Sequence, residues 1–347
     1  MRQSRFKTIT LKDVAEHVGV STATVSSVLN GARSNTRVSE ATRTLIHEAA
    51  AELHYRPHPV ARALRTGRTY IVALLVPDSE GPYYGQFTHQ LTRQVLAHPY
   101  SVLILPPARS PESISDILAR LERTLPDGLF VVDSPQIAVA LASSRSMRHR
   151  PPAVVSLGAF HPGTGDFVGV DLSRPAEKAV AHLLETGRER VAFLSDEATF
   201  SGGFEARRDA YRHVLQEAGR APEFLLAPFQ HRDSAYDFTR AYVALHGCPD
   251  GLFCVNDEMA IGTHRALRDL GRRVPQDVAL IGCDGIIEAE YSNPPLTTLL
   301  QPIAEMCRLG WEILERRIAD PARLPEQIVL EAGLSLRESS HCLLKGT

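Results

Sequence analysis

TLKDVAEHVGVSTATVSSVLNG, residues 10–31, has the spacing of two short helices joined by a tight turn. Thr10 and Asp13 lie three residues apart, in the pattern of a capping box that begins a helix. Gly19 suits the end of that helix, and Ser21 suits the cap of the next one. The crossing of the two helices would be held by Val14, Val18, Val20 and Val25. This pattern predicts a helix-turn-helix, which places its second helix in the major groove of DNA.

The residues around this motif extend the prediction to a small all-helical head. In the second helix, Val25, Val28 and Leu29 would point inward, which leaves Thr22, Ala23, Ser26 and Ser27 outside as candidate readers of base pairs. A third helix is expected after Ser39, with Leu45, Ile46, Ala49 and Leu53 buried. Taken alone, the pattern also fits any small three-helix unit with a glycine turn.

The charge distribution supports a nucleic-acid partner for this head. Residues 1–68 contain 11 Lys and Arg against 5 Asp and Glu, whereas the remaining 279 residues contain 27 against 35. A basic head on an acidic body suggests that the head meets a polyanion.

The same stretch resembles the heads of the lac repressor family of bacterial transcription regulators. The family pattern is T-[ILM]-x-D-V-A-x-x-A-G-V-S-x-x-T-V-S-x-V-[LI]-N. The positions that match are Thr10, Asp13, Val14, Ala15, Gly19, Val20, Ser21, Thr24, Val25, Ser26, Leu29 and Asn30. Val18 replaces the usual alanine, and the similarity continues through residues 38–69. The resemblance implies a sequence-specific repressor that binds a pseudo-palindromic DNA operator.

Carried over position by position, the resemblance implies which residues contact DNA. They are Thr10, Ser21, Thr22, Ala23, Thr24, Ser26, Ser27, Asn30, Arg62, Leu64 and Arg65. Ala23 offers only a methyl group, which suits an apolar contact such as a thymine methyl. Ser27 stands where several relatives carry a longer side chain, and Asn30 is expected to end the helix more than to read a base. VARALR, residues 60–65, resembles the family's hinge helix, with Leu64 as the wedge between base steps. Packing of Leu64 against the body is the alternative.

From Tyr70 onward, the pattern changes to short apolar runs that alternate with amphipathic segments. Examples are YIVALLV (70–76), GLFVVD (128–133), RVAFLS (190–195) and VALIGC (278–283). Such strands separated by helices indicate parallel sheets covered on both faces, and their number over about 270 residues indicates two lobes. The expected fold class is therefore an all-α helix-turn-helix head followed by an α/β body of two doubly wound parallel-sheet lobes. Through the family, this body resembles the periplasmic binding proteins.

We expect three segments along the chain: a DNA-binding domain over residues 8–56, a hinge over 57–68 and an effector-binding domain over 69–340. The resemblance implies that lobe one contains about 69–165 with 297–322, and that lobe two contains about 170–293 with 325–340. The three crossings between the lobes are then expected near 161–172, 285–297 and 318–330.

The family resemblance also implies an effector site between the lobes. Its candidate residues are Tyr83, Tyr84, Asp133, Arg207, Asn256 and Asp284. Tyr83 and Tyr84 follow the first strand, where α/β sheets bind ligands, and they match the family's aromatic pair. Arg207 matches the family's ligand-binding arginine, although its neighbour Arg208 leaves the register open by one. The alternatives are core or lobe contacts for the tyrosines and a helix cap or turn for Asp133 and Asp171.

Two further expectations concern residues beside these candidates. Asp257 is expected to cap the helix that follows it, whereas Asn256 could offer a donor and an acceptor to a ligand. Trp311 lies in an amphipathic stretch and is expected in the core.

The expected effector is a small polar molecule, with a carbohydrate first and a nucleoside or another polar metabolite as the alternative. A partner protein that binds the body in place of a metabolite is a second alternative. We find no G-x-S-x-G, no phosphate-binding G-x-x-x-x-G-K, no H-E-x-x-H and no paired cysteines, so we expect no enzyme, no cofactor and no metal.

The remaining expectations concern location and assembly. The five cysteines form no C-x-x-C pair, the first 20 residues contain charges where a signal peptide needs an apolar run, and no stretch approaches a membrane span. A cytoplasmic protein with no membrane partner is expected. The resemblance implies pairing of two copies. Because the residues after Arg337 lack leucine heptads, we expect a homodimer and not a tetramer.

Substitution of Leu64 by alanine tests the hinge. If Leu64 wedges between base steps, Leu64→Ala should weaken the free energy of operator binding by about a few kcal/mol and should reduce the bend of the bound DNA. It should leave effector affinity unchanged. A gel shift on straight and bent operator fragments measures both effects. Unchanged operator affinity would rule out this role.

Overall fold

The computed structural model describes residues 9–30, 38–55, 66–77, 81–105, 111–134, 151–159, 165–202 and 205–341, together with six single residues between these ranges. The chain divides into two compact units, Met1–Tyr70 and Ile71–Thr347, which we call the head and the body. Each is described by itself.

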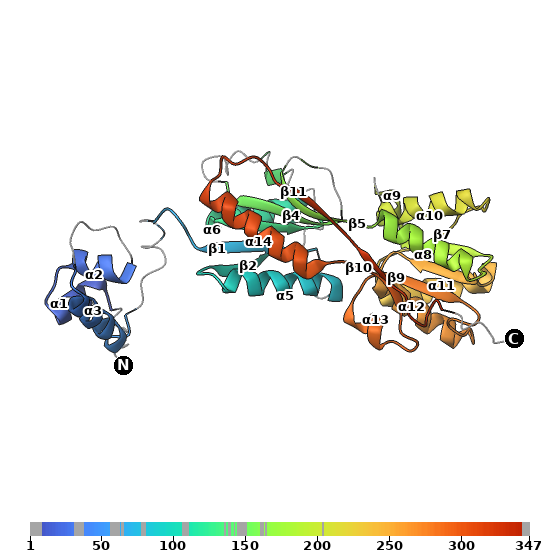
Figure 1. Ribbon diagram of the computed structural model, residues 1–347, viewed down its shortest axis with the longest axis horizontal. Coiled ribbons are helices and arrows are strands. Elements are labelled where there is room, and N and C mark those ends of the chain that lie inside the picture. The colour runs from blue at the N-terminus through green and yellow to red at the C-terminus, as the bar shows by residue number, and fades with distance from the viewer. Residues whose placement is uncertain are drawn as a thin grey trace. The chain divides into compact units, whose positions relative to one another are not determined.

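The head contains the three expected helices, α1 (Leu11–Val18), α2 (Thr22–Asn30) and α3 (Glu40–Glu52) (Figure 1). The capping box is confirmed, because the Thr10 hydroxyl accepts from the Asp13 N–H and the Asp13 carboxylate accepts from the Thr10 N–H. Gly19 ends α1 with a φ of 74°, a left-handed conformation that glycine adopts without strain. Val14, Val25 and Ile46 are fully buried where the three helices meet.

One expected core residue of the head is exposed. Leu45 keeps 54% of its surface, because α3 turns Ile46, Ala49 and Ala50 toward the core and Leu45 falls on the next face. Leu53 is the C-cap of α3 and is only partly buried. The Leu45 prediction was therefore wrong by one position on the helix wheel.

Most of the predicted hinge lies outside the described residues, and Arg62, Leu64 and Arg65 are among those not described. At its end, the Gly67 N–H donates to the Ala63 carbonyl at 2.9 Å.

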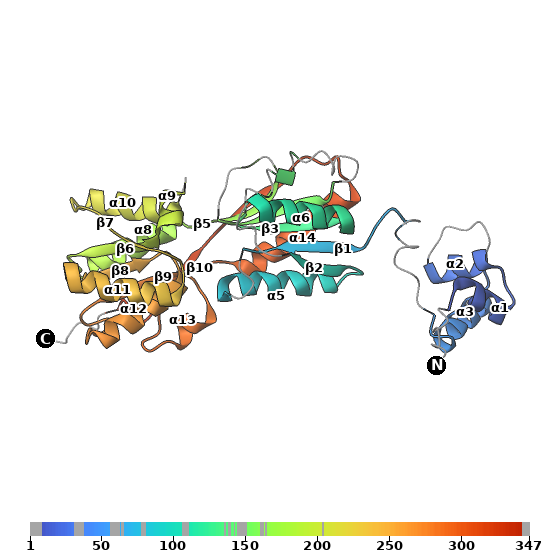
Figure 2. The same ribbon diagram turned by 180° about the vertical axis from the view of Figure 1, so that it is seen from behind.

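The first lobe of the body contains a six-stranded parallel sheet in the order β11-β5-β4-β3-β1-β2. Its strands are β1 (Ile71–Leu75), β2 (Ser101–Leu105), β3 (Gly128–Val132), β4 (Ala153–Ala159), β5 (Asp166–Asp171) and β11 (Gln327–Glu331). Alternate residues of β1 and β3 face opposite sides of this sheet. Val72 and Leu74 pack against α5 (Pro82–Leu96) and α14 (Ile303–Ala319), whereas Ala73 and Leu75 pack against α6 (Pro111–Thr124) (Figure 2).

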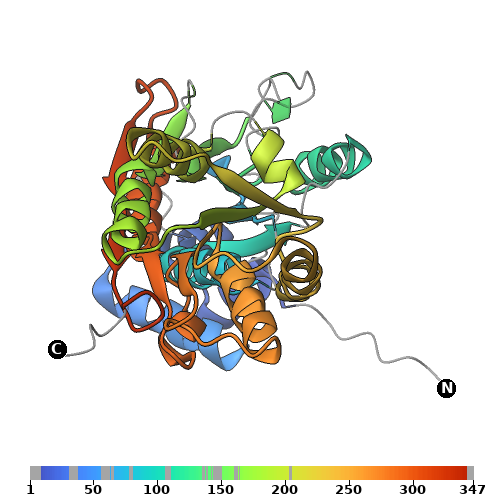
Figure 3. The same ribbon diagram turned by 90° about the vertical axis from the view of Figure 1, so that its right-hand side faces the viewer.

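The second lobe contains another six-stranded sheet, in the order β12-β10-β9-β8-β6-β7. Its strands are β6 (Val191–Asp196), β7 (Glu223–Ala227), β8 (Gly251–Cys254), β9 (Ala279–Asp284), β10 (Thr297–Leu300) and β12 (Gly333–Ser335), of which β12 runs antiparallel to β10. Helices cover both faces of this sheet (Figure 3). They are α8 (Ser173–Glu185), α9 (Glu197–Ser201), α10 (Ala206–Glu217), α11 (Arg232–His246), α12 (Asp257–Asp269) and α13 (Ile287–Tyr291). The predicted fold class is confirmed.

The chain passes between the two lobes after β5, after β10 and after β11 (Figure 1). The three crossings are neighbours, because Leu300 pairs with Gly333 and the Ala332 N–H donates to the Asp171 carbonyl at 3.4 Å. The first crossing follows Asp171 and lies within the expected range of 161–172. The second and third follow Leu300 and Glu331, just beyond the expected ranges of 285–297 and 318–330, so β10 belongs to the second sheet and β11 to the first. Apolar strands of both sheets have the same pattern, so the sequence gives no signal for the sheet that a strand joins.

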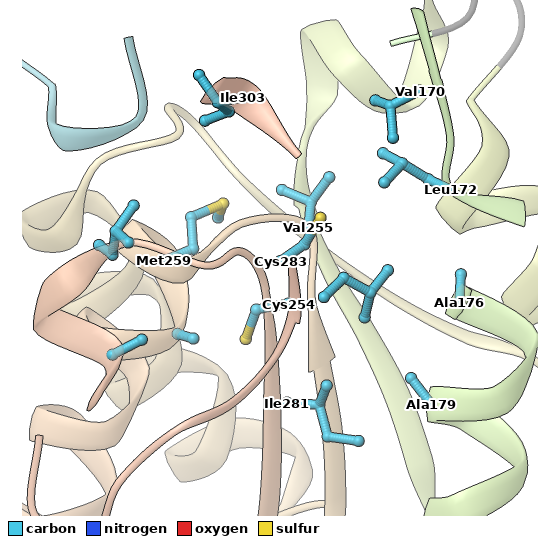
Figure 4. Close-up of a cluster of buried hydrophobic side chains, with 14 of the residues drawn as sticks. Val170, Leu172, Ala176, Ala179, Cys254, Val255, Met259, Ile281, Cys283 and Ile303 are labelled. Carbon is cyan, nitrogen blue, oxygen red and sulfur yellow. The ribbon is translucent and has the colours of Figure 1, made fainter. Parts of the chain in front are cut away.

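One hydrophobic core continues through the crossings. Figure 4 shows Val170 and Leu172, from β5 and just after it, and Ile303, from the start of α14, in the same buried cluster as Val255 and Cys254 of the second lobe. Trp311 keeps 3% of its surface and its ring contacts those of His98 and Tyr100, so its predicted core position is confirmed. In the described part of the chain, no helix is long and apolar enough to cross a bilayer.

Gly262 of α12 tests how closely the second lobe is packed. A Cβ atom there would lie 2.0 Å from the Arg232 carbonyl oxygen, so Gly262→Ala should force α11 and α12 apart and destabilise the body by about 1–3 kcal/mol. Gly85 of α5 is the matched control, since its Cβ would meet nothing within 4 Å. Gly85→Ala should stabilise the body by about 0.5–1 kcal/mol through the helix propensity of alanine. Urea unfolding midpoints measure both changes, and equal midpoints for the two variants would contradict this packing.

Candidate functional site

A pocket of about 1100 Å³ lies between the two lobes, at the carboxyl ends of their parallel strands. Residues of both lobes and of the crossing after β10 line it. All six predicted effector residues are among them: Tyr83, Tyr84, Asp133, Arg207, Asn256 and Asp284. The fold therefore brings together side chains that are up to 201 residues apart in the sequence, the separation of Tyr83 and Asp284. Such a position is where open α/β sheets bind ligands.

Asp133 reaches the pocket from the end of β3. Its backbone has a φ of 40°, and its Oδ1 atom accepts from the Ala159 N–H at 3.0 Å. Gly158 makes room for this carboxylate, because a Cβ atom at Gly158 would lie 1.8 Å from Asp133 Oδ1. The carboxylate thus ties the ends of β3 and β4 together, whereas Asp171 accepts from the Ser173 N–H at the start of α8.

A chain of hydrogen bonds joins the two lobes across the pocket. The Tyr83 hydroxyl donates to Gln301 Oε1 at 3.1 Å, and Gln301 Nε2 donates to Asp284 Oδ1 at 3.0 Å. Tyr83 belongs to α5 of the first lobe, Asp284 ends β9 of the second, and Gln301 lies in the crossing between them. Burial raises the pKa of Tyr83 well above its usual range, and burial together with the charge of Asp257 does the same for the pKa of Asp284. Both groups therefore favour their protonated forms.

Asn256, and not Asp257 as expected, caps α12, while Asn256 also lines the pocket. Asn256 is the N-cap of α12 and accepts from the Met259 N–H at 2.8 Å, and its amide donates to Gln230 at 3.2 Å. Asp257 does not cap the helix. Its fully buried carboxylate accepts from the Gly285 and Ile286 N–H groups at 2.8 and 2.9 Å. It also accepts from the Thr298 hydroxyl at 2.6 Å. The sequence could not show this, because β9, β10 and α12 meet only in the fold.

The two neighbouring arginines, Arg207 and Arg208, point to different surroundings. Arg207 lines the pocket, with its guanidinium bound to Glu205. Arg208 turns away to Asp209 and the Phe200 carbonyl. Arg207 therefore stays the candidate for the ligand-binding position.

Several residues of the pocket were missed in the sequence. Among them are Glu205, Phe229, Gln230 and Gln301. Gln301 follows β10 directly, so its place after a strand was a usable signal. Phe229 and Gln230 lie in the loop after β7, where nothing in the sequence distinguishes them from other loop residues.

In the head, the start of α2 presents the predicted reading face. Ser21, Thr22 and Ala23 are exposed, and Thr24, Ser26 and Ser27 are half-buried. The Ser21 hydroxyl accepts from the Thr24 N–H at 3.1 Å, so Ser21 caps α2 as Thr10 caps α1. Asn30 ends α2, and its side chain is outside the described residues.

A helix-turn-helix head followed by two parallel-sheet lobes with a polar pocket between them defines a ligand-controlled transcription regulator. Residues 10–58 match the family of bacterial regulatory proteins called the lacI family, and residues 180–340 match a periplasmic binding protein-like domain. The chain is 30% identical to the HTH-type transcriptional repressor PurR of Mannheimia succiniciproducens over 332 residues, which cover 95% of this chain and 98% of the relative. The chain belongs to the lacI family, and its members are transcription regulators and not enzymes.

Two solved structures extend the comparison. The regulator CelR in complex with cellobiose is 27% identical, with a TM-score of 0.66, and the match covers 96% of this chain and 100% of that one. The lac repressor bound to ONPG has a TM-score of 0.82 at 23% identity, with 96% of this chain and 100% of that one covered. The second likeness supports the fold, since its identity is low.

Asp257 predicts a pH dependence of stability. Burial raises its pKa to about 7, above the value near 3.9 of an unfolded chain. The unfolded state therefore releases the proton first, and the contribution of Asp257 to the free energy of unfolding falls as the pH rises from about 4 to 7. Between pH 5 and pH 8, wild type should lose on the order of 2 kcal/mol more than Asp257→Asn, which does not titrate. Urea unfolding of both proteins at the two pH values measures this difference, and parallel losses would contradict it.

Proposed function

We propose that this regulator is a repressor whose effector is a small neutral molecule rich in hydroxyl groups, of the carbohydrate class, bound between the lobes. The polar chemistry of the pocket carries the proposal. Carboxyl groups of Asp133 and Asp284 and the amide of Gln301 offer acceptors and donors close to one another. Paired hydroxyl groups both donate and accept, so a sugar satisfies such a set of groups.

Aromatic side chains complete the pocket. Tyr83 and Tyr84 pack edge to face at a centroid distance of 4.9 Å on the first-lobe side, and Phe229 of the second lobe lines the pocket with 65% of its surface exposed. Aromatic rings suit the apolar faces of a sugar ring. The complex of the related CelR with cellobiose is consistent with this class of ligand.

A purine is the second candidate. The curated relatives named PurR suggest a purine-type effector, and a flat base also stacks on aromatic rings. We favour the carbohydrate because two carboxyl groups and a carboxamide converge around Tyr83, within reach of several hydroxyl groups at once.

We further propose that eight residues of the head contact DNA. They are Thr10, Ser21, Thr22, Ala23, Thr24, Ser26, Ser27 and Asn30. Two copies of the chain would place one head on each half of a pseudo-palindromic operator in the cytoplasm. The similarity to a lac repressor dimer bound to operator, at 22% identity, supports the fold that such a dimer requires.

Control of operator affinity would act through the hydrogen-bonded chain Tyr83–Gln301–Asp284. A ligand that binds Asp284 replaces the Gln301 amide and breaks the link between the lobes. The ligand then has different affinities for the linked and unlinked arrangements, which is the requirement for shifting their equilibrium.

A ligand screen on the full chain tests the proposed effector class. Thermal shifts with a panel of neutral mono- and disaccharides, and with hypoxanthine, guanine and adenosine as the purine arm, identify the class that stabilises the protein. An operator selected from random duplexes then reports the response by gel shift, with two chains expected per operator. A response to purines alone would replace the carbohydrate by the second candidate.

Asp284→Ala is the matching variant. It removes a pocket acceptor, so the effector should bind about 10- to 100-fold more weakly. It also removes the hydrogen bond to Gln301, so operator affinity without effector should move toward that of effector-bound wild type. Asp237→Ala, on an exposed face of α11, is the control and should respond normally. A normal effector midpoint in Asp284→Ala would show that the pocket is not the effector site.

A further inference from the structure

Arg207 and Glu205 form a bidentate ion pair inside the pocket. Arg207 Nε donates to Glu205 Oε1 at 2.7 Å, and Nη2 donates to Glu205 Oε2 at 2.8 Å, so both carboxylate oxygens face the guanidinium edge. Each of the two side chains keeps only 12% of its surface. This two-point pairing is the geometry by which an arginine binds a carboxylate or a phosphate ligand. Glu205 therefore occupies the place that an anionic ligand would take.

The rest of the guanidinium is also held by the protein. Nη1 donates to the Val255 carbonyl and lies 3.8 Å from the Cys283 sulfur. Burial alone would raise the pKa of Glu205, but the charge and the hydrogen bonds of Arg207 outweigh it and lower that pKa. Burial would lower the pKa of Arg207, and the charge of Glu205 raises it instead. Both groups stay ionised, and the pair adds no net charge to the pocket.

The other charged groups of the pocket are mostly acidic. Among the described lining residues, Asp171 and Asp196 accept only from uncharged donors: the Ser173 N–H binds Asp171, and the Thr199 N–H and the Gln230 amide bind Asp196. Glu258, also in the lining, is paired with Arg232. Apart from Arg207, the basic lining residue in the described part of the chain is His231. An anion that entered the pocket would meet these carboxylates without a cation that is free to bind it.

We propose that Glu205 determines effector specificity: by occupying the guanidinium of Arg207, it excludes effectors that carry a phosphate or carboxylate group and admits neutral, hydroxylated ones. The inference rests on the proposed function in that the pocket is the effector site. It goes further because it assigns the charge class of the effector to one residue. The same fold with a neutral residue at this position would offer a charged arginine to a phosphorylated ligand.

The test replaces the carboxylate by its amide. Glu205→Gln keeps the size and the oxygen that caps α10, but it leaves the charge of Arg207 uncompensated. Binding is measured by calorimetry and thermal shift on the full chain with matched probes: ribose and ribose 5-phosphate, glucose and glucose 6-phosphate, and inorganic phosphate alone. The variant should bind the phosphorylated probes and inorganic phosphate about 10- to 100-fold more tightly than wild type does.

Glu223→Gln is the matched control. Glu223, the first residue of β7, forms the same kind of two-point pair with Arg190, which precedes β6. Both residues lie outside the pocket lining, so Glu223→Gln removes an ion pair without opening the pocket. It should bind every probe as wild type does. An equal gain of phosphate binding in both variants would show a general charge effect and overturn the proposal.

Two further outcomes decide the proposal. A wild type that binds a phosphorylated probe as tightly as the neutral member of its pair overturns it, and so does a folded Glu205→Gln that gains no anion binding. If the variant does not fold, as judged by circular dichroism, the comparison of matched probes on wild type decides alone. Failure of the carbohydrate proposal is a separate result: no neutral sugar then binds or alters operator affinity, while Glu205→Gln still gains phosphate binding.

Discussion

The buried carboxylate of Asp257 is the interaction on which the arrangement of the pocket depends. It joins three segments that do not adjoin in the sequence, since it starts α12, accepts the N–H groups that follow Asp284 and accepts the hydroxyl of Thr298 on β10. Asp284 has a φ of 122°, and Gly285 has a φ of 72°, so the turn after β9 is an unusual backbone that needs such support. The position of Asp284 in the pocket follows from this turn. The contact between the lobes through Gln301 then follows from the position of Asp284.

Local patterns in the sequence predicted the head and the order of elements well. Thr10 and Asp13 lie three residues apart, and their capping box requires nothing beyond the first turn of α1. The period of α3 was also recognisable, and Ile46 and Ala49 are buried as expected. The exact face of the helix was set by packing, so Ala50 is also buried and Leu45 is exposed. The strands of the body were recognisable by their apolar runs. Their division between two sheets was not, because the composition of a strand does not indicate which sheet it joins.

The sequence predicted the pocket residues that match a family motif. It did not predict the residues that contact and orient them. Arg207 was recognisable beside Tyr211, but the charge state of its surroundings depends on Glu205, whose role is visible only once both side chains are placed. Asp133 could be placed at a strand end, but its orientation depends on Gly158, a glycine 25 residues later on the next strand. Asn256 and Asp257 show the same limit, since which of them caps a helix is decided by partners on β9 and β10.

The three adjacent crossings have a mechanical consequence. A single connection would leave one lobe free to swivel around it, and two would still permit twisting about the line between them. Here, backbone pairing joins the strands on either side: Leu300 to Gly333, and Ala332 to Asp171. Crossing segments that are hydrogen-bonded to each other in this way resist twisting of one lobe against the other. Bending about one axis is then the movement that costs least. We therefore expect the two lobes to open and close mainly about one axis.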